Sequence, residues 1–230
     1  MVKEDKAYIS KEENGNEVVR FRNPNKKVTF TDLIRGDITF DTTELEDFII
    51  ARNINEPLYH LTAVVDDFEG GITHVIRGDD GISNTPRQIL IQEAIGAPKP
   101  VYAHLPLILA ADRSKLSGRH GAVSVTEYKD AGYLPEALIN YLALLGWNPG
   151  TEQEIFSMDE LIQAFDLTKV NKAGAVFNPE KLKWFNKQYI TKMSLDEFKK
   201  AAAPFATDVP EKLWPILKER TIILSELKDL

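Results

Sequence analysis

Residues 112–122 bring together the side chains of this chain that are best suited to phosphate chemistry. They include Arg113, Lys115 and Arg119, together with two serines and two glycines. Cationic side chains on a Gly/Ser loop can wrap a triphosphate and stabilise the negative charge that develops on it. Judged by residue types alone, a charged surface loop is the competing interpretation, and both stay open at this point.

A second cationic region covers residues 166–200, where eight lysines face four acidic residues. The whole chain carries 28 Lys and Arg against 35 Asp and Glu, a formal net charge of −7. This balance argues against a generally basic nucleic-acid coat, since phosphate binding depends on Lys and Arg. A local contact with a polyanion and an ordinary solvated helical face are both compatible with the lysines.

Length and composition describe a globular protein. The 230 residues are 43% hydrophobic, enough for a core in one large or two small domains. No apolar run approaches the ~20 residues of a membrane span, so we expect no membrane contact. The polar start and the absence of cysteine fit a reducing cytoplasm and exclude thiol chemistry, disulfides and cysteine-based zinc sites.

The first half of the chain reads as an α/β region. Short β-rich runs at 17–22, 27–30 and 37–40 predict a small sheet subdomain. An apolar segment at 58–65 and a loop at 66–71 precede a predicted strand at 72–76. Thr85 as N-cap, Pro86 in the first turn and Gly96 at the end predict a helix, followed by a strand at 101–109. This βαβ unit belongs to open α/β sheets, whose ligands lie beyond the carboxyl ends of the strands.

The second half reads as helical. Pro135 and Gly146 bound a helix with helical apolar spacing, Ser157 and Ser194 begin capping boxes, and Asn178 precedes a helix-starting proline. We therefore expect a small helical domain after the α/β region.

Five ordered motifs make this chain resemble glutamyl-tRNA synthetases, class I aminoacyl-tRNA synthetases of the glutamate/glutamine subgroup. Lys115-Leu-Ser-Gly-Arg-His-Gly121 is similar to the second signature of the class in its glutamate form. The other motifs are Tyr59-His-Leu with Val64-Val-Asp-Asp67, Val75-Ile-Arg-Gly-Asp-Asp80, His104-Leu-Pro-Leu107, and Tyr133-Leu-Pro-Glu-Ala-Leu138 with Asn140-Tyr-Leu and Leu144-Leu-Gly-Trp147.

The resemblance implies a fold and a division of the chain. The expected fold class is α/β, a partial Rossmann-type parallel sheet followed by a helical stem-contact domain. Residues 1–57 would end a β-rich connective insertion, and residues 58–110 would form the second half of the nucleotide-binding fold. Residues 111–194 would hold the signature loop and the stem-contact domain, and residues 195–230 would begin a helical anticodon-binding region.

The resemblance also implies site residues. Tyr59 and Arg77 match residues that line a glutamate site, with a core tyrosine and a surface ion pair as the alternatives. Ile108 falls where the family's backbone meets adenine, and otherwise belongs to the core. Lys115 and Arg119 would be the catalytic cations, and Ser117 and Gly118 would join them around ATP. His104 is either a site residue or a structural one.

The implied reaction is ATP-dependent activation of L-glutamate to glutamyl-adenylate, followed by transfer to tRNA. Mg²⁺ would arrive with ATP, with no protein-bound metal or organic cofactor, because Asp66, Asp67, Asp79 and Asp80 fit loop or cap positions better than a metal site. The acceptor stem of tRNA would contact the lysines at 169, 172, 181, 183 and 187. Charging of glutamine tRNA as well as glutamate tRNA stays open.

Two features depart from the family. The His-x-Gly-His signature is absent, since the histidines stand at 60, 74, 104 and 120. We therefore expect an incomplete catalytic domain, with an N-terminal fragment as its complement. The alternative functions are a non-catalytic remnant that binds the acceptor stem, or one half of a split synthetase. The paralogue that glutamylates a modified tRNA base fits less well. Gly118 replaces the usual second lysine of the loop, and we expect Arg113 or Arg119 to compensate in part.

Overall fold

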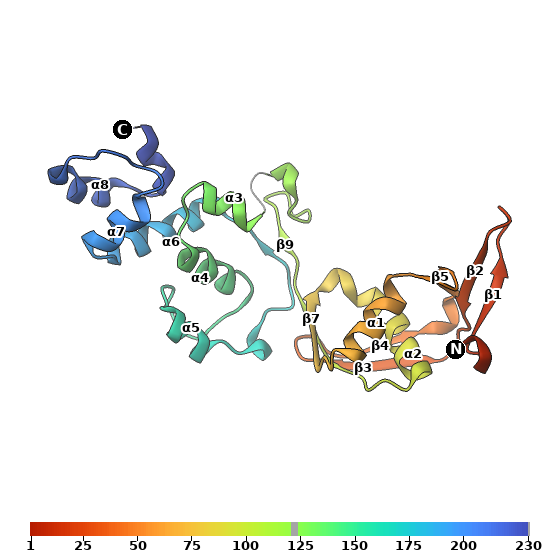
Figure 1. Cartoon of the computed structure of the whole chain (residues 1–230). Coiled ribbons are helices and arrows are strands. Elements are labelled where there is room, and N and C mark those ends of the chain that lie inside the picture. Colours follow the sequence, from red (N-terminus) through yellow and green to blue (C-terminus); the bar gives the residue numbers. More distant parts are fainter. Residues whose placement is uncertain (121–123, 230) are drawn as a thin grey trace. The chain divides into compact units, whose positions relative to one another are not determined.

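The structure is a computed structural model that describes residues 1–120 and 124–229 (Figure 1). The chain divides into two compact units, Met1–Leu105 and Pro106–Leu230. None of the helices in the described part is both long and apolar enough to cross a membrane. The predicted fold class is confirmed, as a partly parallel sheet with helices precedes a mainly helical region.

The first unit contains two four-stranded sheets. The antiparallel sheet has the order β1-β2-β5-β6, and the mixed sheet has the order β4-β3-β8-β7. The strands are β1 (Ala7–Lys11), β2 (Glu17–Phe21), β3 (Lys27–Asp32), β4 (Gly36–Asp41), β5 (Phe48–Asn53), β6 (Glu56–Pro57), β7 (His74–Gly78) and β8 (Val101–Leu105). Helices α1 (Tyr59–Glu69) and α2 (Thr85–Ile95) pack with these sheets around a shared core that includes Phe30, Val64, Ile89 and Tyr102.

The predicted βαβ unit is present as β7, α2 and β8. β7 and β8 are parallel, with His74 opposite Val101 and Gly78 opposite Leu105. α2 ends at Gly96, whose φ of 73° lies in the left-handed region that glycine adopts at little cost. Thr85 is the first helical residue and not the N-cap. Its hydroxyl donates to the Gly81 carbonyl and accepts a hydrogen bond from Arg77.

Two further findings differ from the sequence interpretation. The expected loop at 66–71 is helical as far as Glu69, where Gly70 donates a hydrogen bond back to the carbonyl of Asp66 at 2.8 Å. The antiparallel hairpin of β3 and β4 joins the parallel pair β7 and β8 in one mixed sheet, since Asp32 of β3 pairs with Tyr102 of β8. Strands from the first 57 residues therefore complete the sheet that carries Arg77 and His104.

The second unit is mainly helical. Its helices are α3 (Val125–Asp130), α4 (Pro135–Gly146), α5 (Met158–Ala164), α6 (Pro179–Lys192), α7 (Leu195–Ala202) and α8 (Trp214–Arg220). The capping boxes at Ser157 and Ser194 and the N-cap at Asn178 are confirmed, because each side chain accepts a backbone hydrogen bond of the first turn. One short parallel pair, β9 (Ile108–Leu109) with β10 (Ala175–Val176), joins the start of this unit to the segment before α6.

Candidate functional site

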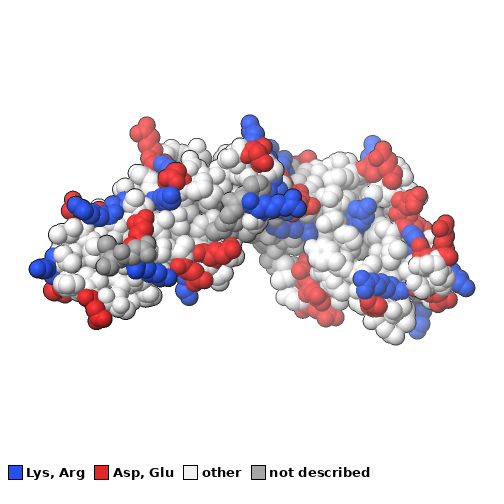
Figure 2. Space-filling view, turned by 90° about the horizontal axis from the view of Figure 1, so that it is seen from above, with Lys and Arg blue, Asp and Glu red and all other residues white. Residues whose placement is uncertain are grey.

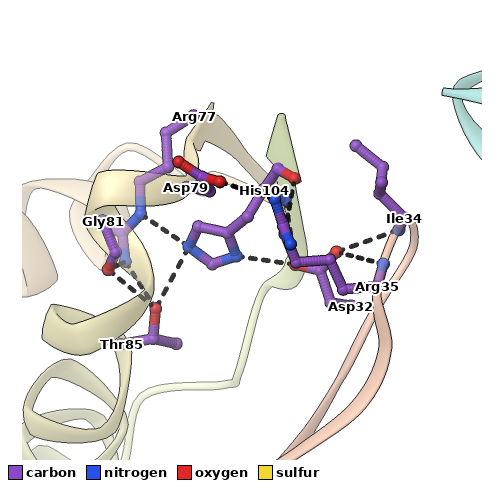
Figure 3. A network of polar contacts seen from close by, with 8 residues as sticks. All are labelled: Asp32, Ile34, Arg35, Arg77, Asp79, Gly81, Thr85 and His104. Carbon is purple, nitrogen blue, oxygen red and sulfur yellow. Dashed lines mark hydrogen bonds and ion pairs between the residues drawn. The ribbon is translucent and has the colours of Figure 1, made fainter. Parts of the chain in front are cut away.

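Arg77 lies near the carboxyl end of β7, and three neighbours hold its guanidinium group (Figure 3). Its Nε donates to Nε2 of His104 at 3.1 Å, and its Nη2 donates to the Thr85 hydroxyl at 2.8 Å and the Gly81 carbonyl at 3.1 Å. Nη1 makes no hydrogen bond to any residue that the structure describes. The interpretation of Arg77 as one half of a surface ion pair is wrong, since its partners are a ring nitrogen, a hydroxyl and a carbonyl.

His104 is a buried histidine with both ring nitrogens in use. Its side chain is 0% exposed, Nδ1 lies 2.7 Å from Oδ2 of Asp32, and Nε2 faces Arg77. The Arg77 Nε–H can only donate, so Nε2 must be the acceptor and the proton of the neutral ring must sit on Nδ1. Burial, followed by the charges of Arg77 and Arg35, lowers the pKa of His104, although the hydrogen bond to Asp32 opposes the shift.

Asp32 supplies the carboxylate behind His104. Its Oδ2 also accepts the His104 backbone N–H, and its Oδ1 accepts those of Ile34 and Arg35, each at 3.0 Å. Four N–H donors thus solvate a carboxylate whose side chain is fully buried. Arg35 continues the network, because its Nε donates to the His104 carbonyl at 3.3 Å and its Nη2 to Asp79 at 2.7 Å.

Sequence reasoning missed Asp32, although a signal was present. Along β3, Val28, Phe30 and Asp32 alternate with exposed residues, so the strand period places this aspartate on the buried, otherwise apolar face. An acidic residue at a core position needs donors around it, and those donors come from distant segments.

Tyr59, the other predicted glutamate residue, begins α1 in the same unit. Its side chain is 60% exposed, which rules out a core tyrosine. The adjacent His60 has a buried Nδ1 without a hydrogen-bond partner among the described residues. Burial, followed by the charges of Arg87 and Arg77, lowers the pKa of His60. Tyr59 and Arg77, the two predicted glutamate-binding residues, thus belong to the same compact unit.

The signature loop begins in the second unit as a tight hairpin on β9. The Ile108 carbonyl accepts the N–H of Leu116 at 2.9 Å, and Leu109 pairs with Lys115 in an antiparallel bridge. Ile108 is 36% exposed, so it is not a plain core residue. At the turn, Arg113 has a φ of 66°, a left-handed conformation that is uncommon for an arginine.

The loop cations are all on the surface. Arg113, Lys115 and Arg119 are exposed, and Ser117 is half-buried. Gly118 begins a 3-10 turn, Gly118–His120, and a Cβ added there would meet nothing within 4 Å. Gly121, the last residue of the motif, lies outside the described residues. A Cβ at position 118 would therefore displace no atom of the described chain.

Gly174 allows the close approach of β10 to β9. A Cβ at this position would lie 2.9 Å from the Leu107 carbonyl oxygen and 2.9 Å from Cδ1 of Leu109. The N–H of Phe177 donates to the Leu109 carbonyl at 2.8 Å on the same side. The segment before α6 thus fixes the strand that carries Ile108 and the hairpin.

The five predicted tRNA-contact lysines have different surroundings. Lys169 is exposed, and Lys172 is exposed with contacts of its own. Lys181 pairs with Glu154 at 2.7 Å and lies 4.0 Å from the Trp184 ring centroid, and Lys183 pairs with Glu180 at 2.9 Å. Lys187 donates to the carbonyls of Lys218, Glu219 and Thr221, and burial lowers its pKa. Lys187 therefore caps the carbonyls at the end of α8. Basic and acidic side chains are interspersed over the face of the molecule shown in Figure 2.

The acidic residues of the first unit show no metal-binding arrangement. Asp79 pairs with Arg35, and Asp79 and Asp80 stand in the first turn of a 3-10 helix, Asp79–Asn84. Within the described ranges, no group of three or more His, Cys, Asp or Glu residues could hold a metal ion.

Comparison with known proteins gives one consistent result. Residues 1–184 match the family model for the catalytic domain of class I tRNA synthetases (E and Q). The glutamate–tRNA ligase of Nitrosospira multiformis is 49% identical over 224 residues, 92% of this chain and 48% of that protein. The corresponding ligase of Aquifex aeolicus is 57% identical over 190 residues, 81% of this chain and 40% of its own length.

Solved structures agree with the sequence relatives. The crystal structure of a glutamate tRNA ligase from Elizabethkingia meningosepticum, in complex with its amino acid, is similar with a TM-score of 0.80 and 38% identity. The match covers 94% of this chain and 49% of that one. The chain spans about half the length of the relatives that it matches.

Proposed function

Since the chain belongs to the class I tRNA synthetases for glutamate and glutamine, we propose that it carries part of the active site of a glutamate–tRNA ligase. In this proposal, residues 1–57 end the connective insertion and residues 58–110 form half of the nucleotide fold. Residues 111–194 hold the signature loop and stem-contact domain, and residues 195–230 begin an anticodon-binding region.

The geometry of Arg77 carries the proposal. An arginine fixed through Nε and Nη2 keeps its remaining Nη1 available, and a planar guanidinium is well suited to a carboxylate. We assign Arg77 to a carboxylate of L-glutamate, with Tyr59 as a second contact from the same unit. The hydrogen bonds to protein groups set the guanidinium orientation before substrate arrives, which reduces the ordering cost of binding.

The signature loop serves ATP in this proposal. The backbone around Ile108 meets the adenine, and Lys115, Ser117, Gly118 and Arg119 surround the phosphates, with Mg²⁺ bound to ATP as part of the substrate. The glutamate carboxylate attacks the α-phosphate, the bond to the β-phosphate breaks, and pyrophosphate leaves. Lys115 and Arg119 stabilise the charge that develops on the phosphates, so positioning and electrostatics supply most of the catalysis.

The second step transfers the glutamyl group to a terminal hydroxyl of tRNA and releases AMP. We propose that Lys169, Lys172, Lys181 and Lys183 contact the acceptor stem. Lys169 and Lys172 precede α6 and are exposed, and Lys181 and Lys183 lie on its first turns with half-buried side chains. Lys187 is left out of this set, since it caps the end of α8.

The test is glutamate-dependent exchange of pyrophosphate into ATP, with total tRNA present. Arg77→Lys keeps the charge but loses the planar fork, and we expect exchange to fall at least tenfold. Arg52→Lys is the matched control. Arg52 lies on β5 and forms an exposed ion pair with Glu56, so this substitution should leave exchange unchanged.

Equal exchange in the wild type and in Arg77→Lys would contradict the assignment of Arg77. Absence of exchange in the wild type, with tRNA still bound, would contradict ligase activity of this chain alone. That result would favour a non-catalytic acceptor-stem-binding protein or one half of a split enzyme, which addition of a complementing N-terminal fragment would separate.

A further inference from the structure

We propose that the buried pair of Asp32 and His104 is the positioning device for Arg77, which it holds in the orientation that binds the glutamate carboxylate. The inference rests on the proposed function, because that function gives Arg77 its role. His104 acts through Arg77 and is therefore a positioning residue, not a catalytic one.

The direction of each hydrogen bond supports the proposal. Asp32 is an acceptor toward both the backbone N–H and Nδ1 of His104, so it selects the tautomer with the proton on Nδ1. Only this tautomer presents a lone pair at Nε2 to the Nε–H of Arg77, 3.1 Å away. The other tautomer would set two N–H groups against each other. Asp32 thus ensures that Arg77 meets an unprotonated ring nitrogen.

The other side of the guanidinium is shaped by Gly81. A Cβ at Gly81 would lie 2.6 Å from Nε and 2.8 Å from Cδ of Arg77, so the arginine side chain packs against the glycine backbone. The Gly81 carbonyl and the Thr85 hydroxyl receive Nη2. With Gly81 on one side and His104 on the other, the plane of the guanidinium has little freedom, and Nη1 is its one atom without a described partner.

The strands that supply these groups are far apart in sequence and adjacent in the sheet. Asp32 ends β3, Arg77 lies on β7, and His104 lies on β8 between them. Arg35, three residues after Asp32, donates hydrogen bonds to the His104 carbonyl and to Asp79. The sheet order therefore places Asp32, His104 and Arg77 side by side on three adjacent strands (Figure 3).

The first experiment is ¹⁵N NMR of the histidine rings and arginine side chains in the full chain without ligand. We expect His104 to be protonated at Nδ1 and not at Nε2 at neutral pH, and the Nε–H of Arg77 to exchange slowly with water. A proton on Nε2 of His104, or fast exchange at Arg77 Nε, would overturn the proposal whether or not the chain binds glutamate.

Two variants then separate positioning from general structural support. His104→Gln keeps an acceptor near the position of Nε2, whereas His104→Asn keeps a donor to Asp32 but cannot reach Arg77. We expect His104→Asn to raise the dissociation constant for L-glutamate about tenfold or more and to speed exchange at Arg77 Nε, with His104→Gln within about threefold of wild type on both. Thermal denaturation of both variants checks that each is folded.

Equal weakening of glutamate binding by the two variants would overturn the proposal, since a merely structural histidine does not distinguish them. Failure of the wild type to bind glutamate, with the predicted tautomer and a protected Arg77 Nε–H, would count against the proposed function. In that case the exchange rates of the two variants still decide whether His104 orients Arg77.

Discussion

At the scale of single residues, His104 works in its neutral form. Asp32 from β3 faces Nδ1, Arg77 from β7 faces Nε2, and Arg35 contacts the backbone carbonyl. Protonation would place an N–H of the ring against the Nε–H of Arg77 and a third positive charge beside those of Arg77 and Arg35. The geometry of the site and the lowered pKa of His104 thus favour the same state of the ring.

The first prediction concerns pH and stability. A histidine with a lowered folded-state pKa binds fewer protons in the folded than in the unfolded chain, where its pKa is ~6.5. The free energy of unfolding should therefore decrease as pH falls below ~6.5 toward the folded-state pKa, with contributions from His104 and His60. Urea denaturation between about pH 7.5 and 5.5 measures this decrease.

His104→Gln and His60→Gln should each make the decrease shallower, and His74→Gln serves as the exposed control. A decrease of the same size in the wild type and in both variants would show that other groups cause it.

The second prediction concerns Gly118. Restoring a lysine there adds a cation at a position where a Cβ would meet no described atom within 4 Å, so Gly118→Lys should lower the dissociation constant for Mg·ATP about fivefold without loss of stability. Gly118→Ala supplies the Cβ without the charge and should leave ATP affinity unchanged. If alanine has the same effect as lysine, loop flexibility and not charge limits ATP binding.

At the scale of elements, locally encoded features were predictable and long-range pairings were not. Capping boxes, Pro135 and Gly96 act within a few residues, so the sequence placed the ends of their helices correctly. The pairing of Asp32 with Tyr102 joins segments 70 residues apart and leaves no local pattern. For the same reason His104 and Arg77 could be singled out from motifs, whereas their link through Asp32 required the sheet.

The third prediction concerns the pair β9 and β10. Gly174→Ala forces a Cβ against the Leu107 carbonyl and Leu109, so we expect a loss of ~1–3 kcal/mol in unfolding free energy and weaker ATP binding through the displaced hairpin. Gly146→Ala is the matched control, because its Cβ would meet only Cγ of Pro106 at 3.7 Å, an ordinary contact. Urea denaturation and ATP titration of both variants test this, and equal stability of the two would refute it.

At the scale of the whole molecule, the negative net charge has to be compatible with the proposed binding of a polyanion. The chain has a net charge of −7, so the proposed contact with tRNA has to depend on particular exposed lysines and not on a general basic surface. Lys169 is such a residue, whereas Lys187 is occupied by three backbone carbonyls. The two lysines provide a test of how the proposed stem contact is distributed.

The fourth prediction follows from that contrast. Lys169→Gln should reduce the slope of log affinity for tRNA against log salt by about 1 and leave unfolding free energy nearly unchanged. Lys187→Gln should leave the slope unchanged and cost ~1–3 kcal/mol of stability, since three carbonyls at the end of α8, two of them part-buried, lose their donor. Filter-binding assays at several salt concentrations, together with urea denaturation, provide both readouts; a reversed pattern would exchange the roles of the two lysines.

The pairing of β9 with β10 also sets an order of events during synthesis. Leu109 receives its hydrogen bond from Phe177, so the strand that carries Ile108 stays unpaired on that side until residue 177 has left the ribosome. At ~5–20 residues per second this interval lasts several seconds, during which an apolar strand edge is exposed to other nascent chains. A chain released before that point would contain every cation of the signature loop and still have no strand to anchor it.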